Sequence, residues 1–163
     1  MLSTTACTFF SPQATLKHYD PSDGVGTTIG DVKVENAILL SKNGKDASFL
    51  VNFINDGDKD VRLLVQYDEP GAKGSKVDTT VRVGAGETKT FGSSDTRQLV
   101  FTDIDTKPGA LFPVFVQYGE KTGKQLLVPV LDGSQKEYAG LLPTPTPTPT
   151  PTSTPSPSSS PTN

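Results

Sequence analysis

The feature that most constrains the fold is a series of short segments in which apolar and polar residues alternate. Residues 61–67 (VRLLVQY) carry apolar side chains at every second position, and residues 77–83 (VDTTVRV) repeat the pattern with Thr79 at one of these positions. A period of two places one apolar face on a β-strand. No window of helical length shows an apolar period of 3.6 residues that is free of glycine and proline. The pattern therefore predicts an all-β domain.

Five further segments are typical of strands, and the turn signals lie between them. Asn43-Gly44 is a strong hairpin signal, because both central residues of a type I′ turn need a positive φ. Pro113 and Pro129 favour strand edges or bulges, because proline cannot donate a hydrogen bond to a neighbouring strand. The five segments are residues 31–41, 47–55, 97–104, 110–118 and 124–132.

About seven short strands with regular turns predict an immunoglobulin-like antiparallel β-sandwich over residues 24–141. The Cys-Trp-Cys pattern of true immunoglobulin domains is absent, so a barrel stays open as the alternative. A body of this length can bury a core without disulfides or metals. Most aromatic residues are expected in that core, and the loops at the two ends of the sandwich are expected to hold any protein or glycan contact.

The chain ends in a segment of a different kind. Residues 142–163 (LPTPTPTPTPTSTPSPSSSPTN) contain no charge and no aromatic ring. Alternating proline favours polyproline II at roughly 3.1 Å per residue, so we expect a disordered tail that extends on the order of 60 Å. The tail is either a spacer across a cell-wall matrix or a segment without a partner. The chain thus divides into residues 1–23, 24–141 and 142–163.

The charge pattern argues against a nucleic-acid partner, and the hydropathy pattern argues against a membrane-spanning helix. The net charge is -3, with acidic and basic residues interspersed. No basic stripe is present to neutralise a phosphate backbone, so no nucleic-acid partner is expected. No apolar run approaches the roughly 20 residues that a membrane-spanning helix needs.

The sequence also shows no recognisable set of catalytic residues. Nucleophilic catalysis needs a base beside a nucleophile, and the single histidine, His18, precedes the first predicted strand. Asp103 and Asp105 could pair for acid/base chemistry, but carboxylates in a turn are commonly solvated turn residues. We therefore expect no catalytic residues, no cofactor and no enzymatic activity.

Two metals can be tested against the sequence. Bacterial envelope copper chaperones are small β-sandwiches that bind through methionine and histidine, and this chain has one of each. Asp56–Asp60 (DGDKD) resembles the opening of a calcium loop, but Val61 stands where that loop needs glycine and Tyr67 where it needs glutamate. No metal site is predicted.

The single cysteine, Cys7, points to covalent lipid attachment. The residues L-S-T-T-A-C resemble the lipobox of bacterial lipoproteins: Ala6 fits the position before the cysteine, while Thr4 stands where leucine is usual. Only six residues precede Cys7, fewer than the charged and apolar regions of a signal peptide require. We therefore expect the sequence to begin inside a signal peptide, and Cys7 to be the lipidated residue of an exported protein.

Several short segments, CTFFSPQAT, HYDPSDGVG, NDGDKD and VPVLDG among them, resemble a family of small actinobacterial surface lipoproteins, similar to the Lpq-type lipoproteins of mycobacteria. The resemblance implies a lipid-anchored envelope domain with an immunoglobulin-like fold and no established chemistry. The resulting hypothesis is a non-enzymatic protein on the outer face of the cell membrane that binds a cell-wall or envelope partner. The alternative is an envelope carrier of a small ligand or metal.

Overall fold

The protein is described by a computed structural model that covers residues 23–72 and 74–144. This part of the chain holds no helix, and so none long and apolar enough to cross a membrane. The all-β class is confirmed, and each of the seven predicted segments contains a strand. The strands are β1 (Val25–Ile29), β2 (Val32–Leu40), β3 (Ala47–Asn55), β4 (Val61–Asp68), β5 (Lys76–Val83), β6 (Thr88–Phe91), β7 (Leu99–Phe101), β8 (Leu111–Tyr118) and β9 (Lys124–Leu131).

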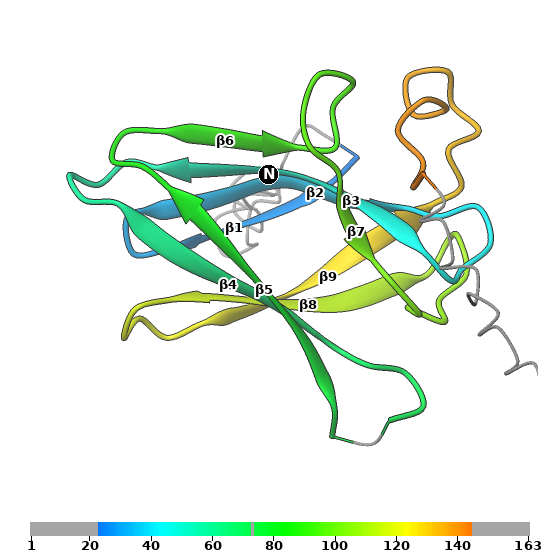
Figure 1. The fold of residues 1–163 in the computed structure, drawn as a ribbon, viewed down its shortest axis with the longest axis horizontal. Helices are drawn as coiled ribbons and strands as arrows, with labels where there is room; N and C mark the ends of the chain where they lie inside the picture. Colours follow the sequence, from blue (N-terminus) through cyan, green and yellow to red (C-terminus); the bar gives the residue numbers. More distant parts are fainter. Residues whose placement is uncertain (1–22, 73, 145–163) are drawn as a thin grey trace, which may run out of the picture.

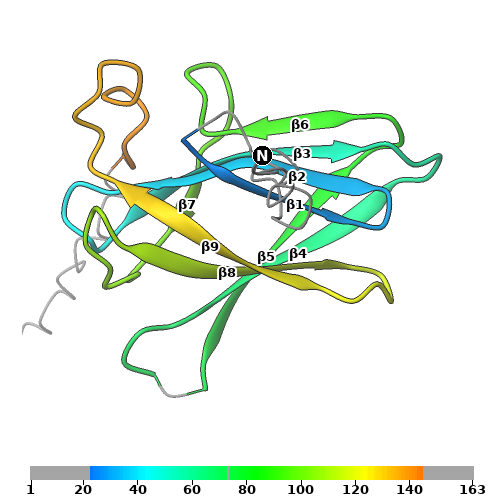
Figure 2. The ribbon, with the colours of Figure 1, turned by 180° about the vertical axis from the view of Figure 1, so that it is seen from behind.

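The strands form a sandwich made from one curled sheet. Strands β1, β2, β3, β6 and β7 make one layer, and β4, β5, β8 and β9 make the other (Figure 1). The layers join where β9 pairs with β2, at Leu39–Val130 and Leu40–Leu131. This pair is parallel and all the others are antiparallel, so the predicted antiparallel sandwich is confirmed with one parallel contact added. Figure 2 shows the same join from behind.

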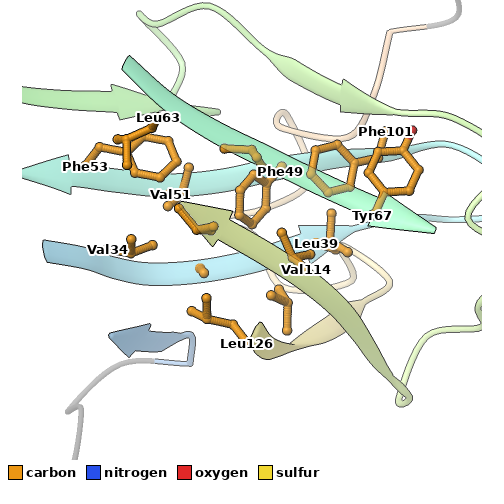
Figure 3. Packing of buried hydrophobic residues seen from close by; sticks show 14 of the residues in the cluster. Val34, Leu39, Phe49, Val51, Phe53, Leu63, Tyr67, Phe101, Val114 and Leu126 are labelled. Atoms are coloured by element: carbon orange, nitrogen blue, oxygen red, sulfur yellow. The ribbon is translucent and has the colours of Figure 1, made fainter. Parts of the chain in front are cut away.

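The core lies between the layers and consists of the alternate side chains that the sequence pattern points inward (Figure 3). Its aromatic centre is a group of rings from different strands. The rings of Tyr67 and Phe101 stack with centroids 4.4 Å apart, and Phe49 lies 4.9 Å from Phe101. The Tyr67 hydroxyl accepts a hydrogen bond from the backbone N–H of Thr102 at 3.1 Å. The buried phenol is thus satisfied, and this ring is part of the core.

Both strand prolines lie where their strand has a partner on one side only. Pro113 of β8 pairs with Leu127 of β9, but the pairing between β8 and β4 stops at Phe115. Pro129 of β9 pairs with Leu111 of β8, and the pairing with β2 begins at Val130. A missing N–H costs nothing where no neighbouring strand accepts it. The prediction of local strand edges is confirmed.

The hairpin between β2 and β3 is present, but its turn differs from the predicted one. The connection spans residues 41–46, and Gly44 has a φ of +73° while Asn43 does not have a positive φ. Side chains build this loop instead: the N–H of Gly44 donates to the Ser41 hydroxyl at 2.9 Å, and the N–H of Lys45 donates to Asn43 Oδ1 at 2.9 Å. The type I′ prediction was wrong, because polar side chains close a longer loop.

A second apolar cluster lies on the outer side of the β2–β3 layer. A β-bulge at Asn36, which has a φ of +53°, changes which side chains of β2 face outward. Leu40 consequently points away from the core, yet it is fully buried. Residues 132–144, here called the C-terminal cap, cover it and are drawn in orange in Figure 1. The cluster contains Ile38, Leu40, Leu50, Leu131, Tyr138, Leu141 and Leu142.

Polar contacts hold the C-terminal cap at its middle and at its C-terminal end. The Tyr138 hydroxyl donates to the carboxylate of Asp23 at 2.8 Å. The side-chain amide of Gln98 donates to the carbonyl of Leu142 at 3.1 Å and accepts from the N–H of Thr144 at 3.3 Å. The first residues of the proline-rich segment are therefore fixed against the body. The rest of that segment lies outside the described residues.

Candidate functional site

The residue predicted to carry lipid, Cys7, lies outside the described residues, as does His18. Together with Met1, these are the only cysteine, histidine and methionine in the chain. The described part of the chain therefore contains no soft metal ligand and no imidazole. The lipid anchor at Cys7 stays a prediction.

Asp103 and Asp105 are exposed, and they flank Ile104, whose side chain is 1% exposed in the core. Both aspartates have positive φ values, +52° and +43°, which short polar side chains tolerate better than most. Asp105 lies 3.8 Å from the ammonium of Lys45. These contacts explain the two residues as a loop that inserts Ile104 into the core, as expected for turn carboxylates.

The loop at Asp56–Asp60 sends its carboxylates to separate partners. Asp56 lies 2.8 Å from the ammonium of Lys33, and Asp60 lies 2.6 Å from the guanidinium of Arg82. The hydrogen bond from Arg82 lowers the pKa of Asp60 below its usual value, and the bond to Asp56 raises the pKa of Lys33. No group of three or more possible ligand side chains converges in the described part of the chain. The loop is an ion-paired turn.

Asn55 organises this end of the sandwich. Its side-chain amide donates to the carbonyls of Lys59 at 2.7 Å and Gly84 at 2.9 Å, and its Oδ1 accepts from the N–H of Gly57 at 3.1 Å. A hollow of about 460 Å³ opens beside these turns. Its charged lining carries both signs: Asp31, Asp58, Lys59, Asp60, Arg62 and Lys121. Such a mixed, open surface fits a solvated loop region.

The outer face of the β4–β5–β8–β9 layer has a different character. Leu111 and Leu127 are 57% and 53% exposed, the two large exposed hydrophobic residues of the described chain. Pro113, Phe115 and Pro129 point to the same side, since they alternate with core residues along β8 and β9. We call these five residues the β8–β9 patch. An exposed apolar group of this kind is a signature of a binding surface.

A groove borders this patch where β4 and β8 separate. Their pairing ends at Gln66–Phe115, and beyond that point the β4–β5 hairpin projects away from the rest of the layer (Figure 1). The space between them is a hollow of about 130 Å³, here called the β4–β8 groove. It is lined by Gln66, Tyr67, Asp68, Lys76, Pro113, Phe115 and Gln125.

The sequence pattern predicts most aromatic residues in the core and does not distinguish this face. The signal was the run LFPVFV in β8, which is apolar at consecutive positions. A strand with one solvated face alternates, whereas a strand that is apolar on both faces does not. Phe112, Val114 and Val116 fill the core, and the residues between them form the patch.

No protein-family model matches the chain, and no curated protein matches it in sequence. Solved structures of PCuAC domains resemble it in fold. The apo PCuAC domain of PmoF2 is 13% identical, over 66% of this chain and 94% of that chain, with a TM-score of 0.50. The apo domain of PmoF1 (17% identical, 66% and 98% covered, TM-score 0.49) and the copper-bound domain of PmoF2 (12%, 66% and 97%, 0.49) are similar as well. The likeness shows a shared β-fold.

The described residues do not fit a copper ion. Protein copper sites are built from imidazole, thiolate and thioether ligands. The described part of the chain contains no histidine, cysteine or methionine. Its fold resembles that of a PCuAC domain, but its side chains in residues 23–72 and 74–144 cannot supply those ligands.

Proposed function

We propose that this chain is a non-enzymatic binding domain of the cell envelope, held at the outer face of the membrane through Cys7. The β8–β9 patch and the β4–β8 groove beside it contact an envelope partner. The single observation that carries the proposal is the exposure of two large apolar side chains, Leu111 and Leu127, on one face of the sheet. Monomeric proteins seldom leave large contiguous apolar surfaces in water without a use for them.

The covered half of the same outer surface supports this proposal. Because β2 and β9 pair, the outer surfaces of the two layers join at Leu131. On one side of the join the C-terminal cap covers Leu40 and Leu50. On the other side no described segment covers Leu111 or Leu127. The chain covers one half of this outer apolar surface with its own C-terminal cap, and we assign the other half to a partner.

The experiment is binding of the purified full chain to insoluble envelope material, measured as the fraction that co-sediments. The wild type is compared with the double variant Leu111→Ser/Leu127→Ser, and with Lys59→Ser as the matched control in the opposite, polar hollow. We expect the double variant to lose most of the bound fraction and the control to keep it. Equal binding of the double variant and the wild type would remove this face from the function.

The anchor is tested separately. Metabolic labelling with a palmitate analogue should mark the wild type, expressed with a complete signal peptide, and should not mark Cys7→Ala. A lipoprotein carries several acyl chains, which anchor it stably where a single chain would not. Equal labelling of the two proteins would contradict acylation at Cys7.

A carrier of a small ligand or metal is the second candidate, favoured by the PCuAC-like fold at a TM-score of 0.50. Only Met1, Cys7 and His18 could supply the soft ligands of a copper site. Competition of the full chain with a chromogenic Cu(I) chelator tests this candidate directly. A carrier would withdraw one equivalent of copper, and His18→Ala or Cys7→Ser would abolish that; no withdrawal by the wild type would exclude copper.

A further inference from the structure

The β4–β8 groove has two chemically different walls. One wall is apolar and consists of Pro113 and Phe115 of β8. The Phe115 ring is directed toward the β8–β9 hairpin, where a side chain at Gly123 would overlap its Cζ atom. Glycine at this position therefore leaves the space that the ring occupies. The backbone of the β8–β9 hairpin therefore fixes the position of the Phe115 ring.

The opposite wall is a chain of polar contacts on β4 and β5. The Lys76 ammonium donates to Gln66 Oε1 at 2.9 Å, and Gln66 Nε2 donates to Asp78 Oδ1 at 2.7 Å. Asp68 lies 3.9 Å from the Lys76 ammonium. Gln66 is thus held from both sides, so the wall is arranged before a ligand arrives. Pre-arranged groups lose less conformational freedom on binding.

The polar wall both donates and accepts hydrogen bonds, and the two charged side chains that line the groove, Asp68 and Lys76, carry opposite signs. Asp68 offers carboxylate oxygens, Lys76 offers an ammonium, and the Gln125 amide at the rim has no hydrogen-bond partner among the described residues. A polyhydroxylated ligand supplies matching donors and acceptors at every edge, while its C–H face lies on an aromatic ring. A proline-rich peptide offers mainly carbonyl acceptors, so it would give the Asp68 carboxylate no donor beyond the Lys76 ammonium.

We propose that the β4–β8 groove binds one ring of a neutral polysaccharide, with neighbouring sugar units lying along the β8–β9 patch. The apolar face of the ring lies on Phe115 and Pro113, and its hydroxyls bond to Asp68, Lys76 and Gln125. The volume of about 130 Å³ suits a single small ring. This inference rests on the proposed function, because it names the chemistry of the envelope partner for the same face.

The test is native electrophoresis of the full chain through gels that contain dextran, mannan or arabinogalactan, with polygalacturonate as the anionic arm. We expect retardation by at least one of the neutral polymers and none by polygalacturonate. Retardation by polygalacturonate alone would overturn the proposal that the ligand is neutral. Binding of a PTPTPTPTP peptide, without retardation by any polysaccharide, would overturn the glycan in favour of a proline-rich segment.

Three variants assign the binding to the groove. Phe115→Leu keeps most of the apolar volume but removes the aromatic ring, and we expect it to weaken retardation about five- to tenfold, within the range of an aromatic contact. Gln125→Ala should weaken it, while Gln117→Ala, a glutamine on the same face that bonds to the Lys121 carbonyl at 3.2 Å, should not. Equal retardation of Phe115→Leu and the wild type would place the sugar elsewhere.

The outcomes separate the two proposals. If the wild type co-sediments with envelope material but no polysaccharide retards it, the glycan inference fails and the binding face stands. If the wild type does neither, the proposed function fails as well.

Discussion

The outer surface of this sandwich has two apolar halves that the molecule treats differently. Around Leu40 and Leu50 the C-terminal cap completes the packing, and both leucines are buried. Around Leu111 and Leu127 the described chain supplies no cover. The two halves meet at Leu131, so neither the distance along the chain nor a break in the sheet separates them. The difference shows that the cap covers only one of the two halves, and the proposed partner contacts the other.

The largest expected effect compares one leucine from each half. Leu40→Ala should lower the free energy of unfolding by about 3 kcal/mol, because it leaves a cavity beneath the cap. Leu127→Ala, which removes an exposed side chain, should change it by less than about 0.5 kcal/mol. Urea unfolding of both variants measures the difference. Similar losses in the two variants would mean that the β8–β9 patch is structural.

The second effect concerns the contact between Gly123 and the Phe115 ring in the uncovered half. Gly123→Ala places a methyl group against the Phe115 ring, and the forced movement should cost about 1–2 kcal/mol. Gly140→Ala is the matched control in the cap, because a Cβ there would contact nothing and Gly140 does not have a positive φ. Thermal unfolding of both variants checks the contrast. An unchanged Gly123→Ala would show that the Phe115 ring is not held in place.

The third effect is a pH dependence confined to the covered half. Burial, the hydrogen bond to Asp23 and its charge raise the pKa of Tyr138 to about 12, against about 10 in the unfolded chain. The folded protein keeps the phenolic proton longer, so this contribution to stability is lost as the pH rises from about 10 to about 12. Tyr138→Phe should cost about 1 kcal/mol at neutral pH and remove this part of the pH dependence.

Urea midpoints at pH 9 and pH 11 measure that contribution. The control is the wild type under the same conditions, since the two proteins share every other side chain. The same drop between the two pH values in Tyr138→Phe and in the wild type would contradict the role of the Asp23 contact.

The smallest effect lies where the chain leaves the cap. Gln98→Ala removes three hydrogen bonds, one to the carbonyl of Leu142 and two from Thr144, and all three lie near the surface. We expect a loss of about 0.5 kcal/mol in global stability and a clear acceleration of hydrogen exchange at the Thr144 amide. Protection of that amide at the wild-type level would show that the apolar contacts of Leu142 hold the segment alone.

Sequence alone predicted the strands that carry the core, but not two that carry little of it. Alternation identified β4 and β5 because each has one buried and one solvated face. It did not identify β1 (VGTTI) or β6 (TKTF), which are short, rich in threonine and half-buried at most positions. Such strands are stabilised by pairing with residues that are distant in the sequence, so a local pattern does not identify them. The parallel contact between β2 and β9 is unpredictable for the same reason.

The candidate site shows the same limit. Phe115 and Leu127 were visible as apolar residues in predicted strands, but a pattern that is apolar on both faces does not say which side has a partner. The groove depends on where β4 and β8 separate, and Gln66 and Gln125 reach it from distant parts of the sequence. Conversely, the interpretation of Asp103 and Asp105 as turn residues needed only local sequence, and the structure places both in an exposed loop.

Pro113 has a consequence for self-association. From Leu111 to Val114, strand β8 pairs with β9 on one side but has no partner on the side that faces β4. An exposed backbone edge of this kind, beside apolar side chains, can template the addition of strands from other molecules. Proline removes the N–H that a further strand would need there. Many copies of the protein can therefore lie close together with their apolar side chains exposed, without polymerising into cross-β fibres through this edge.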